Sequence, residues 1–332
     1  MFAKLLFLFA AVGVCSCSKG GVAPLLKLND GRAAPGLGLG TWLGFTQKGR
    51  VPVVDDSVEK AVSWAIDAGY RHIDTASIYD TETQVGKAVN AKLKSGAVKR
   101  EDLFIVTKLW NDRHAQEEVV PALQESLARL QLDYVDLYLV HWPIAQYKNG
   151  TYYSSDYIDT WKGMIEARER GLARSIGVSN FNARQLDRLL STTRVTPAML
   201  QVEVNLHLQQ PDLLALCRQH EIAVTGYSPF GELVSSRASD SSPPPRIDDP
   251  KLVAIAEKYN KTVPQIALRY LVELGVIPIP KSVNKERIEQ NINIFDFELT
   301  PKEKSLLKSF DKGYRTIKAE VWKDSVYFPF EK

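Results

Sequence analysis

Short apolar segments alternate with amphipathic segments along nearly the whole chain, and this alternation constrains the fold more than any other feature. The apolar segments have the length of buried strands, and they are Arg71–Thr75, Leu103–Leu109, Val135–Trp142, Ala173–Val178, Met199–Val204, Ala223–Ser228 and Val276–Ile279. The amphipathic segments between them are Ser57–Ala68, Thr83–Leu93, Gln116–Leu130, Asp159–Arg170, Ala183–Leu190, Leu213–Gln219, Pro250–Tyr259 and Pro264–Leu274. Repeated strand-then-helix units predict a parallel sheet that closes into a (β/α)₈ TIM barrel. An Asn-Asp-Gly turn at residues 29–31, between two apolar runs, predicts an N-terminal β-hairpin.

A doubly wound sheet with a nucleotide-binding turn is the alternative fold for such alternation. It requires the pattern G-x-G-x-x-G between a strand and a helix, and this pattern does not occur. The glycines of "GLGLG" at 36–40 are followed by Thr41 and Trp42 rather than by a helix start, which favours a tight first strand. The sequence also contains no P-loop, H-E-x-x-H or paired-cysteine pattern, so we expect no metal site.

The first residues differ from the body of the chain. Lys4 precedes an apolar run, Leu5–Val14, that is too short to span a bilayer and is followed by small residues. We therefore predict a signal peptide at residues 1–17, a single barrel domain at 18–332, and secretion of the protein. An uncleaved buried strand, a membrane anchor and a lipid-modified cysteine remain the alternatives for this segment.

Secretion would expose two N-x-[ST] sequons, at Asn149 and Asn260, to glycosylation. A secreted chain of this size does not require a disulfide, and Cys217, the only cysteine in the body, is expected inside a helix. The net charge is only +3, which gives no electrostatic reason to expect a nucleic-acid or acidic-membrane partner. We expect a monomer.

Polar or reactive residues stand where the apolar strand candidates end. Asp74, Lys108 and His141 end three of them, and Tyr79 follows soon after Asp74. The carboxyl ends of the strands of a barrel share one rim, so these side chains are expected to be neighbours there. Each residue alone could be a turn cap, a surface charge or a core histidine, but their occurrence together favours a catalytic site.

The chain resembles the aldo-keto reductase family from about Leu26 to the C-terminus. The resemblance rests on motifs in the family's order and spacing, which are "GYRHIDTA" followed by Tyr79, "TKLW" at 107–110, "DLYLVHWP" at 136–143, "IGVSNF" at 176–181 and "IPKSV" at 279–283. It implies a barrel that uses a nicotinamide cofactor without a Rossmann domain. It also implies four catalytic residues, Asp74, Tyr79, Lys108 and His141.

These residue types suit the reduction of a carbonyl group by hydride, because the product alkoxide needs a proton. Tyr79 can supply it, and the ammonium of Lys108 is expected to lower the pKa of the phenol from its usual value of about 10. Asp74 would hold Lys108 and offset the cost of burying its charge. His141 would donate a hydrogen bond that orients the substrate oxygen.

The resemblance also implies the cofactor contacts. They are Ser179, Asn180 and Gln201 at the nicotinamide amide, Tyr227 at its ring, Lys281, Ser282 and Arg287 at the 2′-phosphate, Asn291 at the adenine, and Ser228 as a further cofactor contact. Arg and Lys suit a dianionic phosphate, so NADPH is favoured over NADH. The alternative for residues 280–287 is the solvated start of a helix.

The chain departs from the family's pattern in several places. Asn284 stands where Thr is frequent and Gln290 where Glu is frequent, so the grip on the adenine side differs. After "SPFG", where many members have an acidic latch, this chain has Glu232-Leu233-Val234, so the sequence does not predict whether the following loop closes over the cofactor. An insertion at 46–55 lengthens the rim of the barrel, and the loop at 144–156 is shorter than in many vertebrate members.

Trp42, Trp110 and Trp142 fall beside the expected site, and the tail at 326–330 would fold over it, which predicts an apolar substrate pocket. Together with secretion, this makes the chain similar to the insect haemolymph members that reduce 3-dehydroecdysteroids. We expect a small-molecule carbonyl substrate, with an ecdysteroid 3-ketone as the preferred example. A general aldehyde or aldose-type reductase is one alternative, and an inactive barrel that binds NADPH as a regulatory subunit is another.

Overall fold

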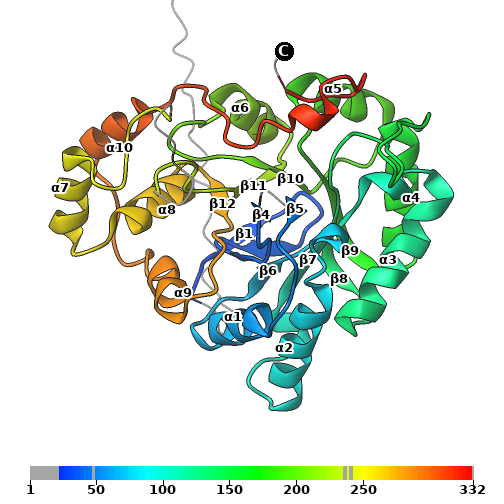
Figure 1. The fold of residues 1–332 in the computed structure, drawn as a ribbon, viewed down its shortest axis with the longest axis horizontal. Helices are drawn as coiled ribbons and strands as arrows, with labels where there is room; N and C mark the ends of the chain where they lie inside the picture. Colours follow the sequence, from blue (N-terminus) through cyan, green and yellow to red (C-terminus); the bar gives the residue numbers. More distant parts are fainter. Residues whose placement is uncertain (1–21, 47–48, 235–237, 239–241, 331–332) are drawn as a thin grey trace, which may run out of the picture.

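The computed structural model describes residues 22–46, 49–234, 238 and 242–330. Eight parallel strands form one sheet, with helices around it (Figure 1). In chain order the strands are β3 (Leu39–Gly40), β6 (His72–Asp74), β7 (Phe104–Leu109), β8 (Val135–Val140), β9 (Ala173–Ser179), β10 (Met199–Glu203), β11 (Ala223–Tyr227) and β12 (Val276–Pro278). Each strand except the first and last pairs with the strands before and after it in this order.

The first and last strands meet, which closes the sheet into a barrel. The amide of Gly38 donates to the carbonyl of Pro278 at 3.0 Å, and the amide of Gly40 donates to that of Pro280 at 3.1 Å. A Cβ on Gly40 would lie 2.9 Å from the carbonyl oxygen of Ile279, so this seam requires glycine. The predicted (β/α)₈ barrel is confirmed, and the doubly wound alternative is wrong.

The predicted helices are all present, with ends that differ by a few residues. They are α1 (Ser57–Asp67), α2 (Glu82–Lys94), α3 (Gln116–Leu130), α4 (Tyr157–Glu169), α5 (Ala183–Thr192), α6 (Pro211–Gln219), α7 (Pro250–Tyr259) and α8 (Val263–Glu273). Cys217 is buried in α6, as expected. Two further helices, α9 (Lys285–Ile292) and α10 (Pro301–Lys308), follow the last strand. Thr300 caps α10 by accepting from the amide of Glu303, and this capping box was the sequence signal for α10.

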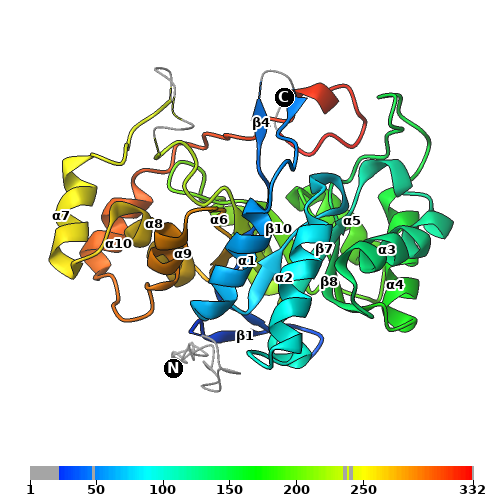
Figure 2. The same cartoon turned by 60° about the horizontal axis from the view of Figure 1, so that its bottom comes forward.

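The N-terminal hairpin, β1 (Leu25–Lys27) and β2 (Ala33–Pro35), closes one end of the barrel. Leu28 and Ala34 of this hairpin pack with the barrel residues Val106, Leu137 and Ile277 in one buried cluster. The same hairpin lies at the end of the molecule opposite to β4 and the C-terminal segment (Figure 2). The carboxyl ends of the strands therefore remain available for a site at the other end.

The insertion at 46–55 contributes to a second hairpin, β4 (Phe45–Thr46) and β5 (Gly49–Arg50), at the carboxyl end of the barrel. Short 3₁₀ turns complete the described structure, and they are η1 (Ser77–Tyr79), η2 (Arg100–Asp102), η3 (Asn111–Arg113) and η4 (Glu320–Trp322). The predicted signal peptide at 1–17 lies outside the described residues, and so do residues 235–237 and 239–241 of the Ser/Pro-rich stretch at 235–246, which the sequence suggests is a surface loop. Among the helices that the structure does describe, none is long and apolar enough to cross a bilayer.

Candidate active site

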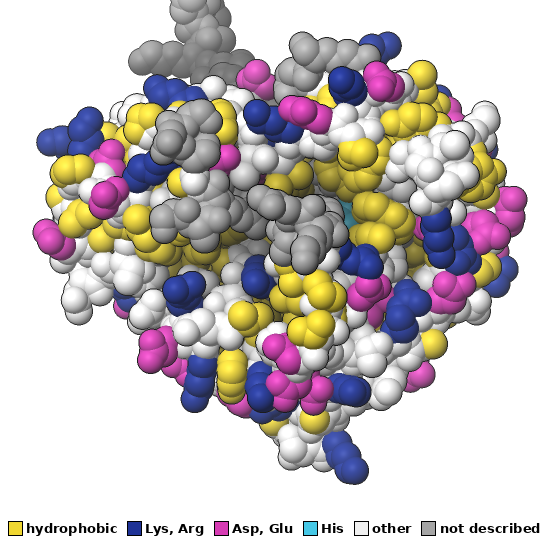
Figure 3. Space-filling view, in the orientation of Figure 1, with side chains coloured by type: hydrophobic (Ala, Val, Ile, Leu, Met, Phe, Trp, Pro, Cys, Tyr) yellow, Lys and Arg dark blue, Asp and Glu magenta, His cyan; other side chains and the backbone are white. Residues whose placement is uncertain are grey.

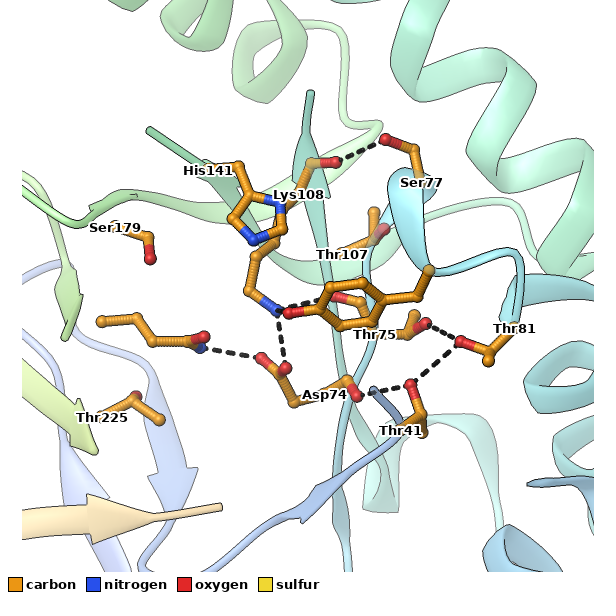
Figure 4. Close-up of polar contacts among 12 residues, drawn as sticks. Thr41, Asp74, Thr75, Ser77, Thr81, Thr107, Lys108, His141, Ser179 and Thr225 are labelled. Atoms are coloured by element: carbon orange, nitrogen blue, oxygen red, sulfur yellow. Dashed lines mark hydrogen bonds and ion pairs between the residues drawn. The ribbon is translucent and has the colours of Figure 1, made fainter. Parts of the chain in front are cut away.

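The centre of the candidate site is the ammonium group of Lys108, which is fully buried on β7. Its Nζ donates to Asp74 Oδ1 at 2.6 Å, to the carbonyl oxygen of Thr75 at 2.9 Å and to the hydroxyl of Tyr79 at 3.3 Å (Figure 4). An ammonium group has three protons, and these contacts use all of them. Burial lowers the pKa of Lys108, while the carboxylate of Asp74 acts in the opposite direction and favours the charged form.

Asp74 is held from two sides at the end of β6, where it is 2% exposed. Its Oδ2 accepts a hydrogen bond from Gln201 Nε2 at 2.8 Å, on β10. Its backbone carbonyl accepts from the amide of Thr41 at 3.1 Å and from the hydroxyl of Thr41 at 3.0 Å (Figure 4). The carboxylate therefore has one orientation, in which one oxygen faces Lys108 and the other faces Gln201.

Tyr79 lies on η1, directly after β6, with its ring 4.9 Å from that of Trp42 and 5.6 Å from that of His141. Burial raises the pKa of Tyr79 well above its usual value, and the charge of Asp74 raises it further. The sequence predicts a lowered pKa for this phenol, but in the structure the pKa is raised, because the phenolate would be desolvated and would lie near the negative charge of Asp74. The phenol therefore keeps its proton at neutral pH.

His141 follows β8, and its backbone amide donates to the carbonyl of Leu109 at 3.1 Å. Its own carbonyl accepts from Asn180 Nδ2 at 2.9 Å, which fixes the residue from β9 as well. Burial lowers the pKa of His141 well below its usual value, and the positive charge of Lys108 lowers it further. His141 is therefore a neutral imidazole that has one N–H to donate.

The residues implied at the nicotinamide form a hydrogen-bonded set next to this group. Asn180, which adopts a φ of 61°, accepts from the hydroxyl of Tyr227 at 2.7 Å and donates to Ser179 Oγ at 3.2 Å. Gln201 belongs to the same set, because its backbone carbonyl accepts from the amide of Asn180 at 2.9 Å, while its side chain donates to Asp74. Ser228 follows Tyr227 with a φ of 46°. The structure thus brings Ser179, Asn180, Tyr227 and Ser228 to the carboxyl ends of β9 and β11, with Gln201 between them on β10.

The residues implied at the phosphate and adenine lie around the start of α9. Lys281 and Arg287 are exposed, whereas Ser282 and Asn291 are buried. Asn284, one of the departures from the family's pattern, caps α9 by accepting from the amide of Arg287 at 2.9 Å. Two cations beside a helix N-terminus suit an anion, so this donor set fits a phosphate group.

Four tryptophans, Trp42, Trp110, Trp142 and Trp322, form an aromatic wall beside Tyr79 and His141. Trp42 packs on Tyr79, and the ring of Trp110 lies 5.1 Å from that of His141. Sequence reasoning missed Trp322 on η4, whose ring lies 4.7 Å from that of Trp142 and 5.9 Å from that of Trp110. Its only sequence signal was an indole ahead of the apolar tail. Figure 3 shows a hollow that is bordered by hydrophobic side chains, with an imidazole visible at its bottom.

Comparison with known proteins decides the family. Residues 36–312 match the model of the aldo/keto reductase family. The chain belongs to the aldo-keto reductase family. It is 53% identical to aldo-keto reductase AKR2E4 of Bombyx mori over 307 residues, which cover 92% of this chain and 98% of that relative. It is 42% identical to aldo-keto reductase family 1 member A1 of Homo sapiens over 308 residues, which cover 89% of this chain and 91% of that relative.

Solved structures of aldo-keto reductases support the same family assignment. Bombyx mori AKR2E4 in complex with NADP superposes with a TM-score of 0.88 at 52% identity, covering 93% of this chain and 99% of that one. The aldo-keto reductase AKR2E5 complexed with NADPH gives a TM-score of 0.91 at 45% identity, covering 93% of this chain and 94% of that one. This aldo-keto reductase is an NADP-dependent oxidoreductase that acts on carbonyl groups of small molecules, and its cofactor is NADPH. In the described part of the chain, no group of His, Cys, Asp and Glu side chains could hold a metal ion.

The buried histidines of this aldo-keto reductase generate a pH prediction. Burial lowers the pKa of His114 to about 3 and that of His72 to about 4, and it holds the pKa of His141 well below its usual range. An unfolded histidine has a pKa of about 6.5, so below that pH the unfolded chain binds protons that the folded chain does not. The free energy of unfolding should therefore fall as the pH drops from about 6.5 to about 5, by up to about 1.4 kcal/mol per pH unit for each histidine.

Urea unfolding at a series of pH values measures this slope. His114→Leu should reduce the slope by up to one proton, because it removes one buried group. A free energy of unfolding that stays constant over this pH range would contradict the prediction.

Proposed function

We propose that this chain is a secreted reductase of bulky apolar ketones, with ecdysteroid 3-ketones such as 3-dehydroecdysone as its substrates. The observation that carries the proposal is the aromatic wall of Trp42, Trp110, Trp142 and Trp322 beside Tyr79 and His141. Burying the face of a steroid against this wall gains roughly 25 cal/mol per Å² of apolar surface. The hydroxyls of a sugar would lose hydration there without dedicated polar partners.

In the proposed mechanism NADPH, when bound, supplies the hydride that reduces the carbonyl carbon. Tyr79 donates its phenolic proton to the carbonyl oxygen as that oxygen gains negative charge. Lys108 already donates a hydrogen bond to the phenol oxygen, so it stabilises the phenolate that remains. Neutral His141 donates to the substrate oxygen and orients it, and Asp74 keeps Lys108 charged and in place.

The residues proposed to hold NADPH divide into two groups. Ser179, Asn180 and Gln201 would bind the nicotinamide amide, while Tyr227 would stack on its ring and Ser228 would add a further cofactor contact. Lys281, Ser282 and Arg287 would bind the 2′-phosphate, and Asn291 the adenine. The exposed cations at the start of α9 support the second group, and the hydrogen-bonded set at β9–β11 supports the first.

The extracellular location is proposed from the apolar run Leu5–Val14, and glycosylation follows from it. Asn149 is exposed, and its Oδ1 accepts from the hydroxyl of Thr151 at 2.7 Å, so the two groups of the sequon already face each other. In the second sequon the hydroxyl of Thr262 caps α8, and Asn260 ends α7 with a φ of 53°. We therefore propose Asn149 as the main glycan site and Asn260 as a weaker one. We further propose a monomer without a nucleic-acid or membrane partner after cleavage.

Removal of the Tyr79 hydroxyl tests the acid. Tyr79→Phe should lower kcat by orders of magnitude while NADPH affinity stays nearly unchanged, because the variant lacks only a proton donor of the transition state. Steady-state kinetics and fluorescence titration with NADPH measure the two quantities. Tyr134→Phe, at the amino end of β8, is the control and should behave as the unmodified enzyme. A Tyr79→Phe variant that retains most of its kcat would refute the assignment, whereas a normal fold with normal NADPH binding and no turnover in the unmodified protein would favour a regulatory barrel.

Replacement of the two cations near α9 tests cofactor selectivity. Lys281→Met and Arg287→Met should each weaken NADPH binding by roughly 1.5–3 kcal/mol, the scale of a hydrogen bond to a charged group. NADH affinity should hardly change, because NADH lacks the 2′-phosphate. Lys302→Met, an exposed lysine on α10, is the control. Equal losses for both cofactors would show that Lys281 and Arg287 do not recognise the phosphate.

Expression in insect cells tests the compartment. The medium should contain a protein that lacks residues 1 to about 17, with glycan removed by Asn149→Gln but largely retained in Asn260→Gln. Mass spectrometry identifies both the N-terminus and the glycan. An intact Met1, or a product confined to the cytosol, would refute the extracellular proposal without affecting the assignment of the reaction.

The substrate preference is measured as kcat/KM with NADPH, because this ratio reports differential binding of transition states. We expect 3-dehydroecdysone to exceed benzaldehyde and a hexose. Trp322→Ala should reduce the value for the steroid far more than the value for benzaldehyde, since only the steroid is large enough to cover the aromatic wall. If benzaldehyde or the hexose exceeds the steroid about tenfold or more, a general aldehyde or aldose-type reductase replaces the hormone proposal.

A further inference from the structure

The hairpin formed by β4 and β5 places one arginine directly against the turn that carries Tyr79. The guanidinium group of Arg50 donates from Nη1 to the backbone carbonyl of Ile78 and from Nη2 to the carboxylate of Asp80. These two residues precede and follow Tyr79 in the chain. We propose that Arg50 is a positioning residue for Tyr79, an inference that rests on the proposed role of Tyr79 as the proton donor.

The turn η1 is short, and its own backbone provides little to hold it. The amide of Tyr79 donates to the carbonyl of Ala76 at 3.0 Å, and the hydroxyl of Ser77 donates to the carbonyl of Lys108 at 3.0 Å. Ser77 thus fastens the start of the turn to β7. The carbonyl of Ile78 belongs to the last turn of a helix, where carbonyls have no partner within the helix. Arg50 supplies that partner and fastens the end of the turn.

Asp80, which follows Tyr79, has the left-handed backbone conformation, with a φ of 59°. Asp adopts this conformation more readily than most residues other than glycine, because its short side chain can form local hydrogen bonds, but the conformation is still uncommon. The contact with Arg50 acts on the side chain of this residue. Arg50 thus contacts both the carbonyl before Tyr79 and the side chain of the left-handed residue after it.

The two contacts together matter more than the ion pair alone. The side chain of Arg50 is 31% exposed and that of Asp80 is 59% exposed, and ion pairs at such exposure contribute little by themselves. The planar guanidinium, however, has donors in a fixed fork, so one group bridges a carbonyl and a carboxylate at the same time. Lysine at this position would have a flexible point charge and could not hold both acceptors in one geometry.

The opposite end of the inserted segment is fastened to the same region. Gln84 of α2 donates from Nε2 to the carbonyl of Asp55, and its Oε1 accepts from the amide of Glu59 at 3.0 Å. The insertion is therefore tied to residue 78, to residue 80 and to the start of α2. The insertion thus restrains the segment that follows β6, and Arg50 makes the contacts on either side of Tyr79.

These contacts are expected to fix the position of the Tyr79 phenol. The hydroxyl of Tyr79 lies 3.3 Å from Lys108 Nζ, which is already a long hydrogen bond. A displacement of about 1 Å between reacting groups can slow a reaction by about a hundredfold. Loss of Arg50 should therefore slow proton and hydride transfer without reducing the affinity for NADPH.

Single-turnover reduction of benzaldehyde by bound NADPH tests the proposal, since it separates chemistry from product release. Arg50→Met should be about tenfold slower or more, Arg50→Lys should recover only part of the rate, and Asp80→Asn should show an intermediate loss. With NADPH deuterated at the transferred position, the isotope effect on kcat should increase in Arg50→Met. The Kd for NADPH should stay within about twofold of that of the unmodified enzyme.

Lys92→Met is the matched control, because it removes an ion pair with Asp67 at the far end of α2. It should leave the single-turnover rate unchanged. A rate for Arg50→Met within about twofold of the unmodified enzyme overturns the proposal, and so does an equal loss in Lys92→Met or a full recovery in Arg50→Lys. If Arg50→Met does not fold, the rate of Asp80→Asn decides.

Tyr79→Phe, measured in the same assay, separates this inference from the proposed function. An active Tyr79→Phe variant would overturn the assignment of the acid and the role of Arg50 together. An inactive Tyr79→Phe variant beside a fully active Arg50→Met variant would overturn only the inference about Arg50.

Discussion

The buried ammonium group of Lys108 is the interaction on which the rest of the site depends. A cation with no exposed surface requires compensation for its lost hydration, and in this structure β6 and the turn after it supply all three acceptors. Asp74 and Lys108 are 34 residues apart, and they meet because β6 and β7 pair in parallel, with Asp74 opposite Val106. The buried charge of Lys108 therefore depends on the strand pairing of the barrel, and the hydrogen bond from Lys108 in turn helps to position Tyr79.

The proton-transfer residues and the residues proposed to bind the cofactor are not separate groups. One oxygen of Asp74 accepts from Lys108 and the other from Gln201, while Asn180 bonds both to the carbonyl of His141 and to the hydroxyl of Tyr227. The backbone amide of Asn180 also donates to the carbonyl of Gln201 at 2.9 Å, so the two groups form one hydrogen-bonded network from β6 to β11. Any change that reorients Gln201 or Asn180 also acts on Asp74 or His141, so binding and chemistry share their structural support.

The barrel and the common rim of Asp74, Lys108 and His141 could be predicted from the sequence, because apolar strands with polar ends are encoded locally. The contribution of Trp322 could not, since η4 lies after the last helix in a segment without periodicity and reaches Trp110 only through the fold. The contact of Arg50 with Ile78 is made to a backbone carbonyl, which no side-chain pattern reports. The direction of the pKa shift of Tyr79 depends on burial, and burial is a property of the packed structure.

Burial shifts the pKa values of Tyr79 and His141 in opposite directions, yet it keeps both groups in the neutral form. It raises the pKa of Tyr79 and lowers that of His141, and in both cases it favours the neutral form, which carries a proton that can be donated. The same burial acts against the charge of Lys108, and there the carboxylate of Asp74 opposes it. The site thus combines two neutral donors with one fixed cation, an arrangement that favours negative charge developing on a substrate oxygen. The carbonyl oxygen of the substrate develops that charge when the carbonyl carbon accepts hydride. The donors and the cation of this site therefore complement the transition state of carbonyl reduction better than they complement the neutral substrate.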